Sequence, residues 1–204
     1  LYVYEGGGYA ALSGCSMELV PSSNGIIDPA DLRKRIRKSK GSRSHFPNAS
    51  LICLENTSNR GGGTCYPLEI LKEVEEVAWE TQCKLHLDGA RLFNAVEASE
   101  QNANNLVSMF DSVSVCLSKG LGAPVGSVLA GTVAFIDQAH RWRKMLGGGM
   151  RQSGVLAAAG IYALDHNLPH LKGDHERANR LAESLSEMEG LNVKLENVQT
   201  NMVY

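Results

Sequence analysis

Segments typical of strands and of helices alternate along this chain, and that alternation restricts the possible folds more than any other feature. Four apolar runs have the length of strands, at residues 50–55, 84–88, 112–118 and 127–130. Between the first two, apolar residues recur three or four positions apart and glutamates fill the intervening positions, as in a helix with one buried side. Helices of this kind connect parallel strands. The sequence therefore predicts an α/β fold with a mostly parallel sheet flanked by helices.

Capping residues mark where several of these helices begin and end. Asp28 can accept hydrogen bonds from free backbone N–H groups, and Pro29 suits the first helical position. Pro67 opens a second helix in the same way. Three further helices are expected at residues 132–145, 152–165 and 174–189, and Gly190 ends the last of them.

Size and charge narrow the class of protein. A chain of 204 residues allows one domain or slightly more, and 43% hydrophobic with 21% charged residues is ordinary globular usage. Lys and Arg number 20 against 22 Asp and Glu, for a net charge of -2 with interspersed signs. This balance gives no electrostatic reason to expect a nucleic acid or an anionic membrane as a partner.

Apolar runs and cysteines indicate the compartment. No run approaches the roughly 18 apolar residues that cross a bilayer, and no secretory start is present, so a soluble protein is expected. The five cysteines form no CxxC pair, which argues against zinc and against a disulfide framework. We therefore expect a cytoplasmic protein without a metal, in which each cysteine is a small buried hydrophobic residue.

Two polar residues follow strand-like runs and could carry chemistry. Asp88 ends one run, and Lys119 follows the next. Ligands bind at the carboxyl ends of strands in open α/β sheets. A partly desolvated Lys119 could form a Schiff base with the aldehyde of pyridoxal phosphate, while Asp88 could keep the pyridine nitrogen protonated. Taken singly, Asp88 could instead be a turn residue and Lys119 a solvated loop residue.

Glycine-rich segments offer further candidates. Residues 120–126 have the spacing GxGxxxG, contain a proline and precede a strand-like run, so they do not match a dinucleotide-binding motif. Residues 147–149 and Arg151 precede an apolar helix, where free N–H groups and a guanidinium suit a phosphate. A flexible connector with solvated Arg151 and Lys144 is the alternative. His86 is expected to be a packed or hydrogen-bonded structural residue.

Three motifs in this sequence resemble the threonine aldolases, which are fold-type I pyridoxal-phosphate enzymes. They read LDGARLFNA at residues 87–95, CLSKGLGAPVGS at residues 116–127 and RKMLGGGMRQSG at residues 143–154. The resemblance extends over essentially the whole chain. It implies a transferase-like major domain that binds pyridoxal phosphate, and cleavage of L-threonine or L-allo-threonine to glycine and acetaldehyde.

The resemblance also implies a role for individual residues. Lys119 would form the Schiff base with the cofactor, and Asp88 would pair with the pyridine nitrogen. Arg91 would approach the side of the ring that carries the phenolic oxygen. Lys144 and Arg151 would lie toward the phosphate, reaching it within the chain or from a neighbouring subunit of a homodimer or homotetramer.

This chain departs from the family pattern at Ser58, where the family usually carries a histidine on the substrate side. The departure predicts a change in rate or in the discrimination between threonine and allo-threonine. The resemblance further implies a major domain over residues 1–170, the start of a small C-terminal domain over residues 171–204, and family segments beyond both ends. Two other readings remain: a different pyridoxal-phosphate lyase that catalyses β-elimination, or a truncated relative that keeps only the fold and the subunit contacts.

Overall fold

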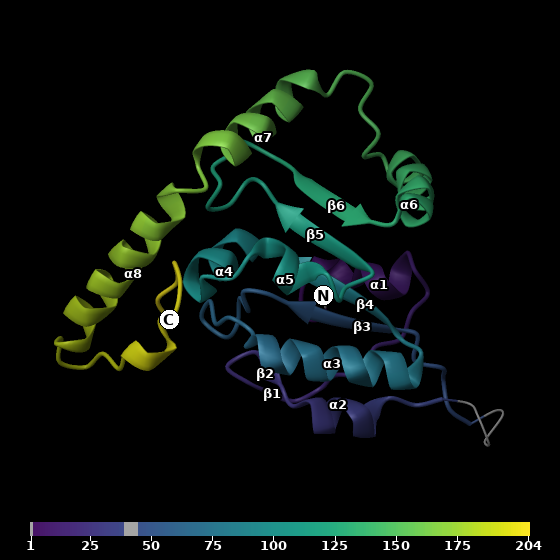
Figure 1. The fold of residues 1–204 in the computed structure, drawn as a ribbon, viewed down its shortest axis with the longest axis horizontal. Coiled ribbons are helices and arrows are strands. Elements are labelled where there is room, and N and C mark those ends of the chain that lie inside the picture. Colours follow the sequence, from purple (N-terminus) through teal and green to yellow (C-terminus); the bar gives the residue numbers. More distant parts are fainter. Residues whose placement is uncertain (1, 39–44) are drawn as a thin grey trace.

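A four-stranded sheet forms the centre of the protein (Figure 1). The structure, a computed structural model, describes residues 2–38 and 45–204. The strands lie in the order β3 (Leu51–Glu55), β4 (Lys84–Gly89), β5 (Ser112–Cys116) and β6 (Ser127–Gly131). The first three are parallel, and β6 is antiparallel to β5. The predicted α/β fold with a mostly parallel sheet is confirmed, together with all four predicted strands.

Helices connect the strands and continue beyond them. The longer ones are α2 (Pro29–Arg35), α3 (Leu68–Thr81), α4 (Leu92–Ser99), α5 (Ala103–Val107), α6 (Val133–Met145), α7 (Gly154–His166) and α8 (His170–Ser186). The shorter elements are η1 (Glu5–Gly7), α1 (Gly8–Ala11), the pair β1 (Ser22–Ser23) and β2 (Ile26–Ile27), and η2 (Leu195–Asn197).

Most of the helix boundaries agree with the sequence patterns. The side chain of Asp28 accepts a hydrogen bond from the N–H of Ala30 at 2.7 Å, which confirms the predicted cap of α2. Thr132 caps α6 in the same manner through the N–H of Phe135. The predicted starts of the last two helices are wrong by a few residues. α7 begins after Ser153, and α8 begins directly after Pro169, whose fixed φ suits a helix start.

One face of the sheet forms the main hydrophobic core. Leu71, Val74 and Val77 of α3 are fully buried, and they belong to one cluster with Leu85 and Leu87 of β4. Residues of α4 and α5 join the same cluster. Because side chains alternate along a strand, every second residue of β3 and β4 points toward these helices. Their burial supplies most of the hydrophobic stabilisation of this half of the protein.

The opposite face of the sheet is more polar and more open. Cys53 of β3 is exposed on this face because it alternates with the buried Ile52 and Leu54. Cys15 is also exposed, so the prediction that each cysteine is buried is wrong for these two residues. The prediction is confirmed for Cys83, whereas Cys65 and Cys116 are half-buried.

The second half of the chain extends away from the main core. No residue of α6 and no residue of β6 is buried, whereas α7 and α8 run along the side of the molecule (Figure 1). A small second cluster joins Leu121 and Ala123 to Ala163 of α7 and Leu171 of α8. Within residues 2–38 and 45–204, no helix combines the length and the apolar character that crossing a membrane requires.

Candidate active site

The carboxyl ends of the parallel strands bring the candidate residues to one edge of the sheet. Glu55 at the end of β3 pairs in register with Asp88 of β4, and Asp88 pairs in register with Ser114 of β5. The N–H of Asn56 donates to the carbonyl oxygen of Asp88 at 2.9 Å, so the loop after β3 starts beside Asp88. Neighbouring strands lie about 4.8 Å apart, which places these groups side by side.

Asp88 has the features of a turn residue and of a site residue together. Its side chain is half-buried, and Oδ1 accepts a hydrogen bond from the N–H of Ala90 at 3.1 Å. This bond fixes the turn that leads into α4, where Arg91 is the N-cap residue. Arg91 is half-buried as well, and it directly follows the turn at the end of β4. The carboxylate and the guanidinium therefore lie at the same edge of the sheet. A carboxylate and a guanidinium there can bind a ligand of mixed polarity.

Lys119 lies beyond the end of β5, on a turn that leads toward β6. The N–H of Gly122 donates to the carbonyl oxygen of Lys119 at 2.9 Å, and the N–H of Ala123 donates to that of Leu117 at 3.0 Å. The side chain of Lys119 is exposed, so the prediction of a partly desolvated amine is wrong for this chain. The reason is that β5 ends at Cys116, and the turn carries the lysine out of the sheet.

His86 belongs to the polar face of β4, two residues before Asp88. Its Nδ1 lies 2.8 Å from the hydroxyl oxygen of Ser112 on β5, in agreement with the expected hydrogen-bonded structural role. Burial lowers the pKa of His86, although the nearby Asp88 carboxylate and the hydrogen bond to Ser112 act in the opposite direction. The imidazole therefore favours its neutral form beside the candidate site.

Lys144 and Arg151 lie on a different part of the molecule. Lys144 is in the last turn of α6, where its Nζ donates to the carbonyl oxygen of Gly149 at 3.2 Å, and Arg151 is in the loop before α7. Both are exposed. Among the described residues, no hydrogen bond or ion pair joins either of them to Asp88, Arg91 or Lys119. Within one chain, the structure thus brings Asp88 and Arg91 together at the sheet edge that Lys119 follows, and leaves Lys144 and Arg151 apart from them.

Ser58 follows the end of β3 and is only 4% exposed. Its hydroxyl accepts a hydrogen bond from the N–H of Gly61 at 3.2 Å, and its backbone pairs with Thr64. Gly25 packs directly on it, because a Cβ at Gly25 would lie 1.9 Å from the hydroxyl oxygen. In this chain the serine therefore stabilises the loop that follows β3.

Sequence reasoning did not single out the two residues before Ser58. Asn56 and Thr57 are completely buried, and the Asn56 Nδ2 and Thr57 Oγ1 atoms have no hydrogen-bond partner among the described residues. Their position directly after a strand that ends in a carboxylate was the available signal. The burial itself depends on the loop of residues 61–65 and on the C-terminal segment, where Thr200 donates to the carbonyl oxygen of Gly63 at 2.7 Å.

Comparisons with known proteins show the family of the chain. The chain matches the family described as beta-eliminating lyase over residues 1–204. It is 48% identical to low-specificity L-threonine aldolase 1 of Arabidopsis thaliana, over 100% of this chain and 57% of that protein. It is 45% identical to the low specificity L-threonine aldolase of Escherichia coli strain K12, over 100% of this chain and 59% of that protein. The chain thus spans somewhat more than half the length of these curated relatives.

A solved structure gives the same result at the level of the fold. The crystal structure of a candidate L-allo-threonine aldolase from Listeria monocytogenes superposes with a TM-score of 0.84 at 25% sequence identity, and the match covers 98% of this chain and 53% of that one. The resemblance to threonine aldolases that the three motifs indicated is confirmed by these similarities. The chain belongs to the beta-eliminating lyase family.

Proposed function

We propose that this chain is part of an enzyme that binds pyridoxal phosphate and cleaves L-threonine or L-allo-threonine to glycine and acetaldehyde. The observation that carries the proposal is the placement of Asp88 near the carboxyl end of β4 and of Lys119 beyond the carboxyl end of the adjacent parallel strand β5, at one edge of the sheet. The names of the relatives support the substrate, since the curated proteins quoted above are low-specificity L-threonine aldolases.

The donor groups at this edge fit the proposed cofactor. Lys119 offers an accessible primary amine for an aldehyde, and Asp88 offers a half-buried carboxylate for a protonated ring nitrogen. Arg91 begins α4 beside Asp88 and offers a cation for an oxygen of the ring. The Ala90 N–H fixes the Asp88 carboxylate through Oδ1, so that group is already oriented.

The reaction breaks the Cα–Cβ bond of threonine, the hydroxyl proton leaves as the aldehyde forms, and Cα gains a proton. When bound, pyridoxal phosphate supplies the aldehyde for the substrate amine and a positively charged ring that accepts the electron pair of the broken bond. The Asp88 carboxylate would pair with that positive charge. Lys119 would hold the cofactor through its amine, and the same amine would move protons at the reacting carbon. Arg91 orients the ring.

The remaining predicted site residues receive roles within the same proposal. Lys144 and Arg151 bind the phosphate from a neighbouring subunit, which fits the lack of any hydrogen bond or ion pair, among the described residues, between either of them and Asp88. Ser58 acts on the substrate side through the loop that follows β3, which its hydroxyl holds by accepting from the N–H of Gly61. Residues 171–204 begin a small C-terminal domain.

A homodimer or homotetramer is the proposed assembly. Apolar side chains are exposed along α6, α7 and the loop between them, among them Val133 at 78% and Val155 at 86%. Trp142 and Met150 are more than half exposed on the same part of the chain. Exposed apolar side chains of this number on one part of a chain support a protein interface. Sedimentation of the purified protein measures the assembly, and a monomer at micromolar concentration would contradict it.

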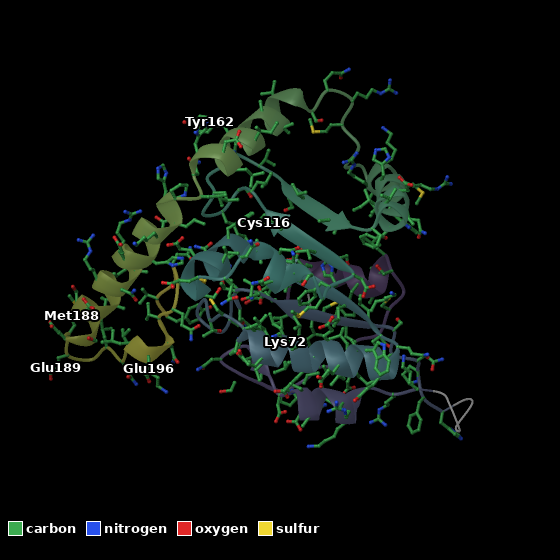
Figure 2. The ribbon with its side chains drawn as sticks, in the orientation of Figure 1. Lys72, Cys116, Tyr162, Met188, Glu189 and Glu196 are labelled. Atoms are coloured by element: carbon green, nitrogen blue, oxygen red, sulfur yellow. The ribbon has the colours of Figure 1, made fainter. Side chains whose placement is uncertain are left out.

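The test of the proposed function is the replacement Lys119→Ala in the enzyme reconstituted with pyridoxal phosphate. We expect loss of the visible absorption band of the bound cofactor and a fall of at least about a hundredfold in acetaldehyde release from threonine. Lys72→Ala is the matched control, because Lys72 is an exposed lysine of α3 outside the site (Figure 2). An unchanged absorption band in Lys119→Ala would remove the assignment.

The family description also favours β-elimination as a second candidate reaction. An assay with threonine and with tryptophan separates the two, because only cleavage of threonine releases acetaldehyde and only elimination from tryptophan releases indole. Activity on neither substrate, with the cofactor bound, would favour a relative that keeps only the fold.

A further inference from the structure

A cleft of about 260 Å³ lies at the turn that follows β3, outside the proposed catalytic site. Three separate parts of the chain form it: Asn24, the turn after β3 with Arg60, and the C-terminal segment with Lys194. Asp88, Arg91 and Lys119 do not line it. The C-terminal segment lies against the turn after β3, where Thr200 donates to the carbonyl oxygen of Gly63. The cleft therefore has its own set of side chains, apart from the proposed catalytic residues.

The charges of the cleft have one sign. Arg60 and Lys194 contribute two cations, three asparagines contribute amide groups, and no Asp or Glu side chain belongs to the lining. Both cations are exposed, and none of the ion pairs among residues 2–38 and 45–204 involves either of them. Glu196 lies near Lys194 along the chain, in η2, and is not part of the lining (Figure 2). An anion would meet two positively charged side chains here that form no ion pair among the described residues.

Hydrogen bonds between the three segments hold the walls of the cleft in place. The hydroxyl of Thr64 donates to the carbonyl oxygen of Asn24, and the amide of Asn24 donates to Oδ1 of Asn197 at 3.0 Å. The N–H of Cys65 donates to Oε1 of Gln199 at 2.8 Å. These bonds connect positions up to 173 residues apart in sequence, so the cleft is a product of the fold. A prearranged site loses less entropy when a ligand binds.

Two features show that Arg60 has a defined position. The guanidinium carbon of Arg60 lies 5.5 Å from the centre of the Tyr4 ring, a stacking distance that limits the motion of the side chain. The turn that carries Arg60 approaches Asn24 so closely that a Cβ on Gly61 would lie 2.0 Å from the Asn24 carbonyl oxygen. The arginine is thus fixed at both its backbone and its head group.

We propose that this cleft binds a small oxyanion, a carboxylate or a phosphate group, between Arg60 and Lys194. A guanidinium presents paired N–H donors that match the two oxygens of such a group, and an ammonium adds a point charge. The volume is below the roughly 300–1,000 Å³ of sites for drug-sized ligands, which favours a small metabolite or ion. The site is separate from the proposed attachment of pyridoxal phosphate at Lys119 and does not depend on it.

Titration calorimetry of the full chain tests the proposal, with sodium phosphate and sodium acetate as the two probes. The buffer has an ionic strength of about 0.01 M, where charges are weakly screened. We expect saturable binding of at least one probe, weakened about tenfold by Arg60→Gln and by Lys194→Gln. Tighter binding of phosphate identifies a phosphate site, and tighter binding of acetate identifies a carboxylate site. Lys72→Gln on α3 is the matched control and leaves the affinity within a factor of two.

Two further variants keep the result unambiguous. Asn192→Asp adds a negative charge to the cleft and removes no cation, so it also weakens binding if the anion occupies the cleft. Lys119→Ala leaves anion binding unchanged, whatever its effect on the enzymatic activity. The proposal is overturned if neither probe binds, if Arg60→Gln and Lys194→Gln bind as tightly as the parent, or if Lys119→Ala abolishes binding.

Discussion

Replacing Gly25 by alanine should destabilise the protein by about 2–5 kcal/mol, because two independent costs add. The backbone of Gly25 has φ = +83°, and a Cβ in that left-handed region costs roughly 1–2 kcal/mol. The new Cβ would also lie 1.9 Å from the hydroxyl oxygen and 2.4 Å from the Cβ of Ser58. Overpacking of a tight site costs typically about 1–3 kcal/mol.

Urea denaturation followed by circular dichroism measures this change, and Gly190→Ala is the matched control. Gly190 has φ = +87°, but a Cβ added there would have no heavy atom within 4 Å. Gly190→Ala should therefore lose only the roughly 1–2 kcal/mol that the left-handed backbone costs. Adding Ser58→Gly to Gly25→Ala should recover the steric part, which a double-mutant cycle isolates. Equal destabilisation by Gly25→Ala and Gly190→Ala would refute the reasoning, as would a cycle without coupling.

Two further predictions concern the same edge of the sheet. Ser58→His should raise turnover severalfold or sharpen the preference between L-threonine and L-allo-threonine. Ser58→Ala is the control, because it removes only the hydrogen bond to Gly61. Equal turnover and equal kcat/KM ratios for the parent and Ser58→His would contradict a substrate-side role. Burial lowers the pKa of His86, so the unfolded chain takes up a proton near pH 6.5 before the folded protein does. The contribution of His86 to the free energy of unfolding is therefore complete above about pH 6.5 and falls as the pH is lowered through that value. Denaturation at several pH values measures this, and His86→Gln should flatten the profile; an identical pH dependence in that variant would exclude His86 as the cause.

Local patterns were sufficient to predict most of the secondary structure. The four strands appear where the apolar runs stand, and α3 buries the residues that recur with helical spacing, such as Leu71 and Val74. The cap at Asp28 follows from chemistry within three residues. Such features depend on neighbours along the chain, so the sequence contains them directly. The ends of α7 and α8 were less accurate because packing and Pro169 set them.

The candidate site was predictable in part. The order of strands and crossovers brings Asp88 to the edge that Lys119 follows, because parallel strands place their carboxyl ends together. The roles of these residues, and of Arg91, Lys144, Arg151 and Ser58, stay predictions, and so does the domain boundary near residue 170. The exposure of Lys119 could not be foreseen, since it depends on β5 ending at Cys116.

The sequence by itself determined the alternation of strands and helices, the family to which the chain belongs, and which polar residues follow the strands. Only the tertiary structure decided which of those residues are exposed, that Ser58 is buried beneath Gly25, and that Arg60 and Lys194 face one cleft. The physical reason is the sequence separation of the residues that interact. Periodicity and caps depend on residues a few positions apart. Burial and electrostatic surroundings depend on segments that meet only after folding, as Asn24 and Asn197 do.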